Sequence, residues 1–355
     1  MALKIKRSLL RLLLVGSTFS GTIADCQQSP QRIQTTQTLK TEGRKEFAEF
    51  GLTRDFVYAI SDDGGVRYYQ WPLNRAQNKV LTFRLPGYSL GDYAYNQVNN
   101  TGYFGIFTDK ADTRLSVLKV PMQLLKSTRS TSLIHKSLDG SPIAVDERSA
   151  RIFTTCSDEL LEYDSKALKL KRRLRGAAGG IVTDISVSRY GELICVRSAA
   201  REDGISQICI VNTRSWRIIY KDGISSRLDK YPLNGVSGFV NGTTYISGRT
   251  KFHISNNRVT VQAIFSELCE PVAICKGSSG KVLCREQGGD FAIWDCNSGQ
   301  RVSKWFKLKN SGLFDDGTGS FDDYVRVSHH VVAVRSTDRK RIMVYTLPQS
   351  ITRQR

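Results

Sequence analysis

The densest group of carboxylates lies in a long segment between two apolar runs, from Lys307 to Tyr324. Glycines interrupt this segment, so its backbone could turn around an ion. Carboxylate oxygens on such a backbone are the ligands that calcium prefers. The spacing differs from that of an EF-hand loop, and a solvated surface loop is the competing interpretation. No other cofactor is expected. The candidate ligands are Asp315, Asp316, Asp322 and Asp323.

The chain contains 8 cysteines, and none has the CxxC spacing of redox and zinc motifs. Cys195 and Cys209 are placed symmetrically about a loop, and so are Cys275 and Cys284. Each pair could therefore face across a hairpin, and in an exported protein both could oxidise to disulfides. The alternative is that all four are buried, small apolar side chains, which is the usual environment of a free cysteine.

Positive charge dominates the composition, with 52 Lys and Arg against 33 Asp and Glu, for a formal net charge of +19. Such a balance favours acidic partners, either proteins or polymers. The densest basic stretch runs from Lys166 to Arg175 and could contact an anionic membrane surface, or could protect a sheet edge from aggregation. No nucleic-acid-binding motif accompanies the charge, so a nucleic-acid partner is not expected.

The first 25 residues have the order of a secretory signal, because basic residues precede a short apolar core and a small-residue site. We expect a targeting segment at 1–25 and export to the periplasm, cell envelope or medium, with import into an organelle as the alternative. Cys26 resembles a lipidated cysteine, although Asp25 stands where a lipobox has a small residue. No apolar run is long enough for a membrane-spanning helix.

Residues 26–45 are predicted to form a polar tether in which 32–39 has enough Ile and Thr for one strand. Residues 46–348 form the predicted folded domain, and 349–355 a basic tail. The clearest unit of the domain runs from Val272 to Phe306, where the apolar runs VAIC, KVLC, FAIW and RVSKWF alternate with turn clusters. This pattern predicts an antiparallel meander of four short strands.

Looser copies of this unit recur along the chain at intervals of about 40 to 50 residues. Their middle strands are continuous apolar runs, and no helical periodicity separates them, which predicts an all-β fold. The runs equivalent to FAIW begin at Val66, Leu115, Leu160, Ile208, Phe252, Phe291 and Ile342.

The segment FAIWDCNSGQRV, with Trp294-Asp295 and Gly299, resembles the end of a WD repeat. From Phe47 to Leu347 the chain is similar to WD-repeat-like β-propellers, which implies a seven-bladed β-propeller of four-stranded antiparallel blades. The last unit has no fourth strand after Tyr345. Because an open blade would leave an edge exposed, we predict that the N-terminal strand at 32–39 joins the last blade and closes the ring.

The resemblance implies a rigid platform with partners on a loop face or at the axial channel. Because no catalytic residues converge in the sequence, we expect a non-enzymatic protein that binds a protein or polymer partner through its loops, and we expect it to be a monomer. We predict that the contacts lie in the loops between the second and third strands of the units. The candidate contact residues are Asp62, Asp63, Asp109, Arg114, Arg201, Glu202, Arg249, Lys251, Arg339, Lys340 and Arg341.

The alternative function is a hydrolase or lyase that acts in the axial channel, with or without a bound cation. Histidine contributes little to this hypothesis, because the adjacent His329 and His330 would point to opposite faces of a strand. Such an enzyme would need carboxylates near the starts of the innermost strands, where the candidates are Asp92, Asp146, Asp184 and Asp323.

Overall fold

The computed structural model contains only β-strands as regular structure in the residues that it describes. Those residues include no helix that could cross a membrane. The prediction of an all-β fold is therefore confirmed. The structure describes residues 31–40, 46–52, 56–61, 66–70, 81–83, 88–96, 101–108, 116–121, 134–137, 142–146, 148–199, 206–222, 236–265, 269–276, 280–286, 289–309, 325–328, 330–336 and 338–348.

Strands consecutive in sequence pair antiparallel to form four-stranded sheets that follow one another along the chain. The first two sheets comprise β3 (Phe47–Leu52), β4 (Phe56–Ser61), β5 (Val66–Gln70) and β6 (Leu81–Phe83), then β7 (Tyr88–Asn96), β8 (Thr101–Thr108), β9 (Ser116–Pro121) and β10 (Ile134–Ser137). The next three comprise β11 (Ala144–Asp146), β12 (Arg151–Cys156), β13 (Glu159–Asp164) and β14 (Leu170–Leu174); β15 (Ile181–Val187), β16 (Leu193–Ala199), β17 (Ser206–Asn212) and β18 (Arg217–Asp222); and β19 (Ser237–Phe239), β20 (Thr244–Ser247), β21 (Thr250–Ser255) and β22 (Arg258–Ala263).

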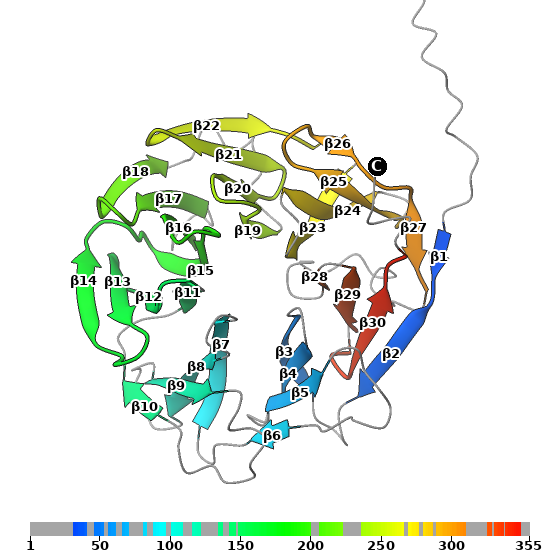
Figure 1. Cartoon of the computed structure of the whole chain (residues 1–355), viewed down its shortest axis with the longest axis horizontal. Coiled ribbons are helices and arrows are strands. Elements are labelled where there is room, and N and C mark those ends of the chain that lie inside the picture. The colour runs from blue at the N-terminus through cyan, green and yellow to red at the C-terminus, as the bar shows by residue number, and fades with distance from the viewer. Residues whose placement is uncertain are drawn as a thin grey trace, which may run out of the picture.

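The remaining strands form one larger sheet, because a short parallel pairing joins β23 to β28. Its N-terminal strand β2 lies antiparallel to β30, with Thr35 opposite Tyr345 and Lys40 opposite Arg341. Figure 1 shows all the sheets arranged around a common centre, with β2 beside β30. The strands are β1 (Gln31–Ile33), β2 (Thr35–Lys40), β23 (Cys269–Lys276), β24 (Lys281–Glu286), β25 (Phe291–Asp295), β26 (Gln300–Arg301), β27 (Phe306–Leu308), β28 (Val325–Ser328), β29 (Val331–Arg335) and β30 (Arg341–Thr346).

The apolar cores lie between neighbouring sheets. Phe153 of β12, for example, is in one buried cluster with Ile194 and Cys209 of the next sheet. Middle strands are therefore covered on both faces, as the continuous burial of β13 and β29 shows. Outer strands such as β14 alternate between half-buried and exposed residues instead. Burying a side chain as large as Phe153 stabilises the fold by about 2–3 kcal/mol.

The run RVSKWF does not form the single fourth strand that its sequence predicts. It is divided between β26 and β27, because the hydroxyl of Ser303 accepts a hydrogen bond from Ile293 N at 2.8 Å and interrupts the ladder. The strand β27 continues beside β1 in a parallel pairing, with Phe306 opposite Gln31. The other three apolar runs of this unit lie in β23, β24 and β25.

Of the two alternatives for Cys195 and Cys209, the structure shows buried, free thiols and no disulfide. In the β16–β17 hairpin Cys195 lies opposite Ile210, and Cys209 lies opposite Val196. A shift of one residue turns a side chain to the other face of the sheet. The two thiols are consequently free and buried, and they belong to different core clusters.

The same alternative, buried and free thiols, holds for Cys275 and Cys284. Cys284 lies opposite Pro271, and the β23–β24 ladder has an irregularity between Pro271 and Ala273. The ladder is therefore not centred where the sequence symmetry places it, and Cys275 does not lie opposite Cys284. Both cysteines are free and buried, again in separate clusters.

Candidate functional site: a turn surface around Tyr190

The predicted contact residues that the structure describes lie in two turns of different sheets, β20–β21 and β29–β30. Arg339, Lys340 and Arg341 are exposed, as a docking role requires. Lys251 is buried, and its ammonium donates to the backbone oxygens of Cys296 at 3.1 Å and Asn297 at 3.4 Å. Its assignment as a contact residue is therefore wrong, since the side chain links two neighbouring sheets. The half-buried Arg249 completes this set.

Other predicted residues lie outside the described part of the chain. This holds for the possible lipidation site Cys26 and for the carboxylates proposed to bind a cation, Asp315, Asp316, Asp322 and Asp323. It also holds for the contact residues Asp62, Asp63, Asp109, Arg114, Arg201 and Glu202. Within the described ranges, no three His, Cys, Asp or Glu residues are grouped so that they could hold a metal ion.

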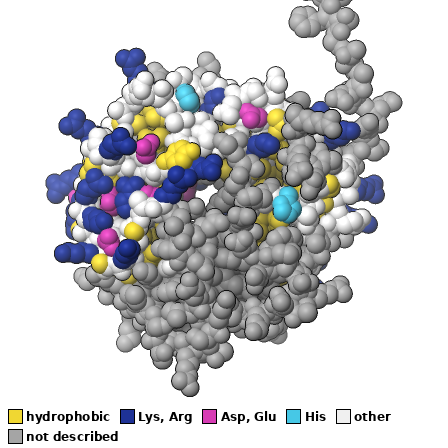
Figure 2. All heavy atoms as spheres, viewed as in Figure 1, with side chains coloured by type: hydrophobic (Ala, Val, Ile, Leu, Met, Phe, Trp, Pro, Cys, Tyr) yellow, Lys and Arg dark blue, Asp and Glu magenta, His cyan; other side chains and the backbone are white. Residues whose placement is uncertain are grey.

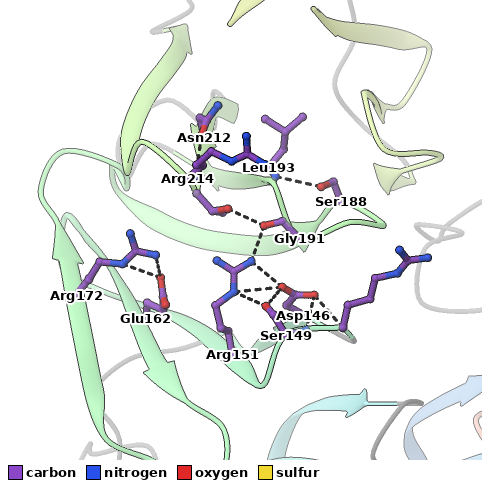
Figure 3. A network of polar contacts seen from close by, with 12 residues as sticks. Asp146, Ser149, Arg151, Glu162, Arg172, Ser188, Gly191, Leu193, Asn212 and Arg214 are labelled. Atoms are coloured by element: carbon purple, nitrogen blue, oxygen red, sulfur yellow. Dashed lines mark hydrogen bonds and ion pairs between the residues drawn. The ribbon is translucent and has the colours of Figure 1, made fainter. Parts of the chain in front are cut away.

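Figure 3 shows a polar network at the β11–β12 turn, centred on the buried carboxylate of Asp146. One oxygen accepts the backbone N–H of Arg148 at 3.0 Å, which fixes the turn. The other accepts from the hydroxyl of Ser149 and from Arg151 Nη2, the latter at 2.7 Å. Arg151 Nη2 also donates to the backbone oxygen of Gly191 at 2.7 Å, so the network reaches the β15–β16 turn of the next sheet.

This junction requires glycine at position 191. Gly191 has a φ of 70°, a left-handed conformation that other residues adopt only with strain. A Cβ atom there would lie 2.0 Å from Asp146 Oδ2 and 2.8 Å from Arg151 Nη2. The Gly191 oxygen also accepts from Thr213 Oγ1 at 2.7 Å, which brings the β17–β18 turn to the same point.

The buried Asp146 is held as a charged group. Burial by itself would raise its pKa, but hydrogen bonds from Ser149, Arg148 and Arg151 outweigh that effect and lower the pKa of the carboxyl. A carboxylate committed to these partners is a structural element and is poorly suited to acid–base work. On the neighbouring inner strand, Asp184 accepts from Ser237 Oγ at 2.9 Å. The structure does not describe the side chains of Asp92 and Asp323, the other two candidates for the axial channel.

Tyr190 lies in the turn that follows β15, the inner strand that carries Asp184. It is one of two exposed large hydrophobic residues within the described ranges, with 51% of its surface accessible. The guanidinium of Arg148 lies over its ring, 4.7 Å from the centroid. A Cβ at Gly242 would be 2.7 Å from Tyr190 Cδ2, so the ring also rests against the β19–β20 turn. Three neighbouring sheets thereby fix one exposed aromatic side chain.

Further turn residues surround this ring. Arg189 is exposed, and Arg214 forms a 3.3 Å ion pair with Glu192 in which both side chains are largely exposed. Such exposed pairs contribute little to stability and can exchange partners. We define the Tyr190 turn surface as the exposed residues Arg148, Arg189, Tyr190, Glu192 and Arg214.

This surface was absent from the sequence-based candidates, which concentrate on the opposite type of loop, between second and third strands. One local signal could have indicated it. The tetrapeptide Arg189-Tyr190-Gly191-Glu192 places an aromatic residue in the turn between two apolar runs. A large aromatic side chain that stays exposed in a turn is a typical feature of a binding surface.

No protein-family model and no curated protein matches the chain. Among solved structures, it is similar to the crystal structure of the β-propeller domain of Cps50 (Swd1) from Myceliophteria thermophila. The two share 11% sequence identity with a TM-score of 0.57, and the match covers 88% of this chain and 100% of that chain. At this identity the likeness shows the fold alone, and the chain therefore has a β-propeller-like fold.

Proposed function

We propose that the chain is a seven-bladed β-propeller that acts as a non-enzymatic binding platform for an acidic partner protein. The seven recurrent units in the sequence support the number of blades. The strand order β28, β29, β30, β2 supports closure of the ring by the N-terminal segment, because β2 stands where the last unit needs its fourth strand.

The observation that carries the proposal is the exposed ring of Tyr190, fixed between Arg148 and Gly242. Tyrosine and arginine are enriched at the energetic centres of protein interfaces. A ring that is already immobilised loses little conformational entropy when a partner covers it. The arginines at positions 148 and 189, together with the net charge of +19, favour an acidic partner.

The test is quantitative capture of partners by the full-length protein from an extract of its native host. The variant Tyr190→Ala is compared with Ile181→Ala, since Ile181 is the other large exposed hydrophobic residue and begins the strand that Tyr190 follows. We expect a specific partner to be recovered about tenfold less by Tyr190→Ala and undiminished by Ile181→Ala. Equal recovery by both variants would overturn the proposal.

The proposed export of the protein is tested on the same material. The N-terminal peptide of the protein isolated from its host is identified by mass spectrometry. We expect residues 1–25 to be missing, because their charge order suits a cleaved secretory signal. Recovery of the intact N-terminus would contradict export by this route.

A further inference from the structure

A second basic surface lies on β14, the outermost strand of its sheet. Alternate residues from Lys169 to Arg175 are exposed, and those between them are half-buried. Figure 2 shows Lys and Arg side chains gathered along the left margin of the molecule, where Figure 1 places β14 and β18. We define the β14 rim as Lys166, Lys169, Lys171, Arg173 and Arg175.

The rim already binds carboxylates of its own sheet. Lys171 Nζ lies 3.0 Å from Asp164 Oδ2. The carboxylate of Glu159 bridges two arginines, with 3.3 Å to Arg173 Nη1 and 3.2 Å to Arg175 Nε. These pairs show that cations spaced along the strand can share carboxylates. Since the cations are exposed, the pairs are weak and can exchange with an incoming acid.

Positive charge remains in excess on the rim. Lys166 and Lys169 are exposed and have no acidic partner among the residues that the structure describes. The Arg175 side chain is 87% exposed even with its bond to Glu159. An acidic ligand would therefore find unpaired cations at one end of the rim and exchangeable ones at the other.

Addition of a partner strand to the edge of β14 is hindered. The indole N–H of Trp216 donates to the backbone oxygen of Arg173 at 3.0 Å and so occupies part of that edge. The ring of Trp216 also lies under the guanidinium of Arg172, at 4.4 Å. It is thus not free to stack on bases, as a platform for single-stranded nucleic acid requires. Recognition on this rim must come from side-chain charges.

The rim also lacks an apolar group that could enter a lipid bilayer. Leu168 is buried, and Leu170 and Leu174 are half-buried against core clusters. Stable binding of a membrane surface usually combines charge with inserted apolar side chains. An acidic protein segment needs only the charges. In an extended segment, alternate side chains recur about every 6.6 Å, which is also the spacing of alternate residues on β14.

We propose that the β14 rim is a second docking surface, which binds an extended acidic segment of a partner protein through side-chain ion pairs. The β14 rim shares no residue with the Tyr190 turn surface, so a partner could engage both or either. The acidic segment lies across the exposed cations of the rim. Its carboxylates replace those of Glu159 and Asp164 as the partners of these cations.

The experiment uses the full chain and a fluorescently labelled peptide of alternating Glu and Ser. The rim variant replaces Lys166, Lys169 and Arg175 by Ser. The matched control variant replaces Lys40, Arg258 and Lys304 by Ser. These are three exposed cations on strands or turns away from β14, and their replacement removes the same charge. Thermal unfolding verifies that both variants fold. Inorganic polyphosphate and vesicles containing phosphatidylserine are measured in parallel.

We expect the rim variant to bind the peptide about tenfold more weakly than the wild type, and the control variant to bind within about twofold. Equal losses in the two variants would overturn the proposal in favour of diffuse attraction by net charge. Loss of binding to polyphosphate or vesicles that is confined to the rim variant, with peptide binding unchanged, would overturn it in favour of a phosphate-bearing partner.

Discussion

The indole N–H of Trp216 donates to the backbone oxygen of Arg173 at 3.0 Å and ties the β17–β18 turn to the outer strand of the preceding sheet. Trp216 has a φ of 53°, which is uncommon for a residue with a side chain. Arg172 lies over the same ring and donates to the buried Glu162 at 3.0 Å. Neighbouring sheets are therefore joined at their outer margins by specific side chains as well as by core packing.

Replacing Trp216 by Phe keeps an aromatic ring under Arg172 and removes the N–H donor. We expect the free energy of unfolding to fall by about 1 kcal/mol, the usual net contribution of one hydrogen bond. Urea denaturation measures it. Trp305→Phe is the control, because Trp305 stacks with Arg301 in the same way, at 5.0 Å, and should change stability by less than about 0.5 kcal/mol. Equal losses in the two variants would contradict the inter-sheet hydrogen bond.

The Gly191→Ala substitution tests the close junction with Asp146. The new Cβ would meet the Asp146 carboxylate at 2.0 Å, so the turn must shift and the network must open. We expect a loss of about 3 kcal/mol in the free energy of unfolding. Gly176→Ala is the matched control, with φ of 72° and nothing within 4 Å of the added atom; it should lose about 1 kcal/mol. Indistinguishable losses would contradict the junction.

The Asp146→Asn substitution tests the charged state of this buried side chain. Because the native pKa of Asp146 is lowered below its ordinary value of 3.8, ionisation stabilises the folded state above that pH. The contribution is lost as the pH falls through the native pKa. We expect the variant to be less stable than the wild type by about 2 kcal/mol near neutral pH, with a gap that narrows in acid. A gap that is constant with pH would contradict this.

Alkylation of the native protein by iodoacetamide, followed by mass spectrometry, tests the cysteine assignments. Burial raises the pKa of Cys209 and of Cys275 to about 12, so both are protonated and shielded at neutral pH. We expect Cys156, which is exposed, to be labelled in the native state, and the two buried thiols to be labelled only after denaturation. A peptide containing a Cys195–Cys209 disulfide would contradict the register of that hairpin.

Much of the fold follows from local chemistry that the sequence displays. The β25 run FAIW is apolar because both of its faces are covered. Asp295 then caps the turn, accepting from Asn297 N at 2.7 Å and Ser298 N at 3.0 Å, and Gly299 supplies a φ of 67°. These interactions lie within a few residues, so a single sequence can predict them.

The candidate site could not be predicted in the same way, because residues distant in sequence build it. Arg148, Tyr190 and Gly242 come from three sheets and meet only through the arrangement of those sheets around the centre. The register of paired strands is a second feature that the sequence alone could not predict. In the β16–β17 hairpin the register differs by one residue from the one that would place Cys195 opposite Cys209. The loop geometry sets this register, so the symmetric placement of the two cysteines in the sequence could not predict it.

The most direct test of the binding-platform account places a photo-crosslinking amino acid at position 190 in one variant and at position 181 in another. The two positions are exposed to a similar degree, 51% and 59%, and flank opposite ends of β15. Illumination in the native host should produce a discrete crosslinked partner, rich in Asp and Glu, from position 190 and none from position 181. Crosslinks that are absent at both positions, or identical from both, would contradict a partner seated on the Tyr190 turn surface.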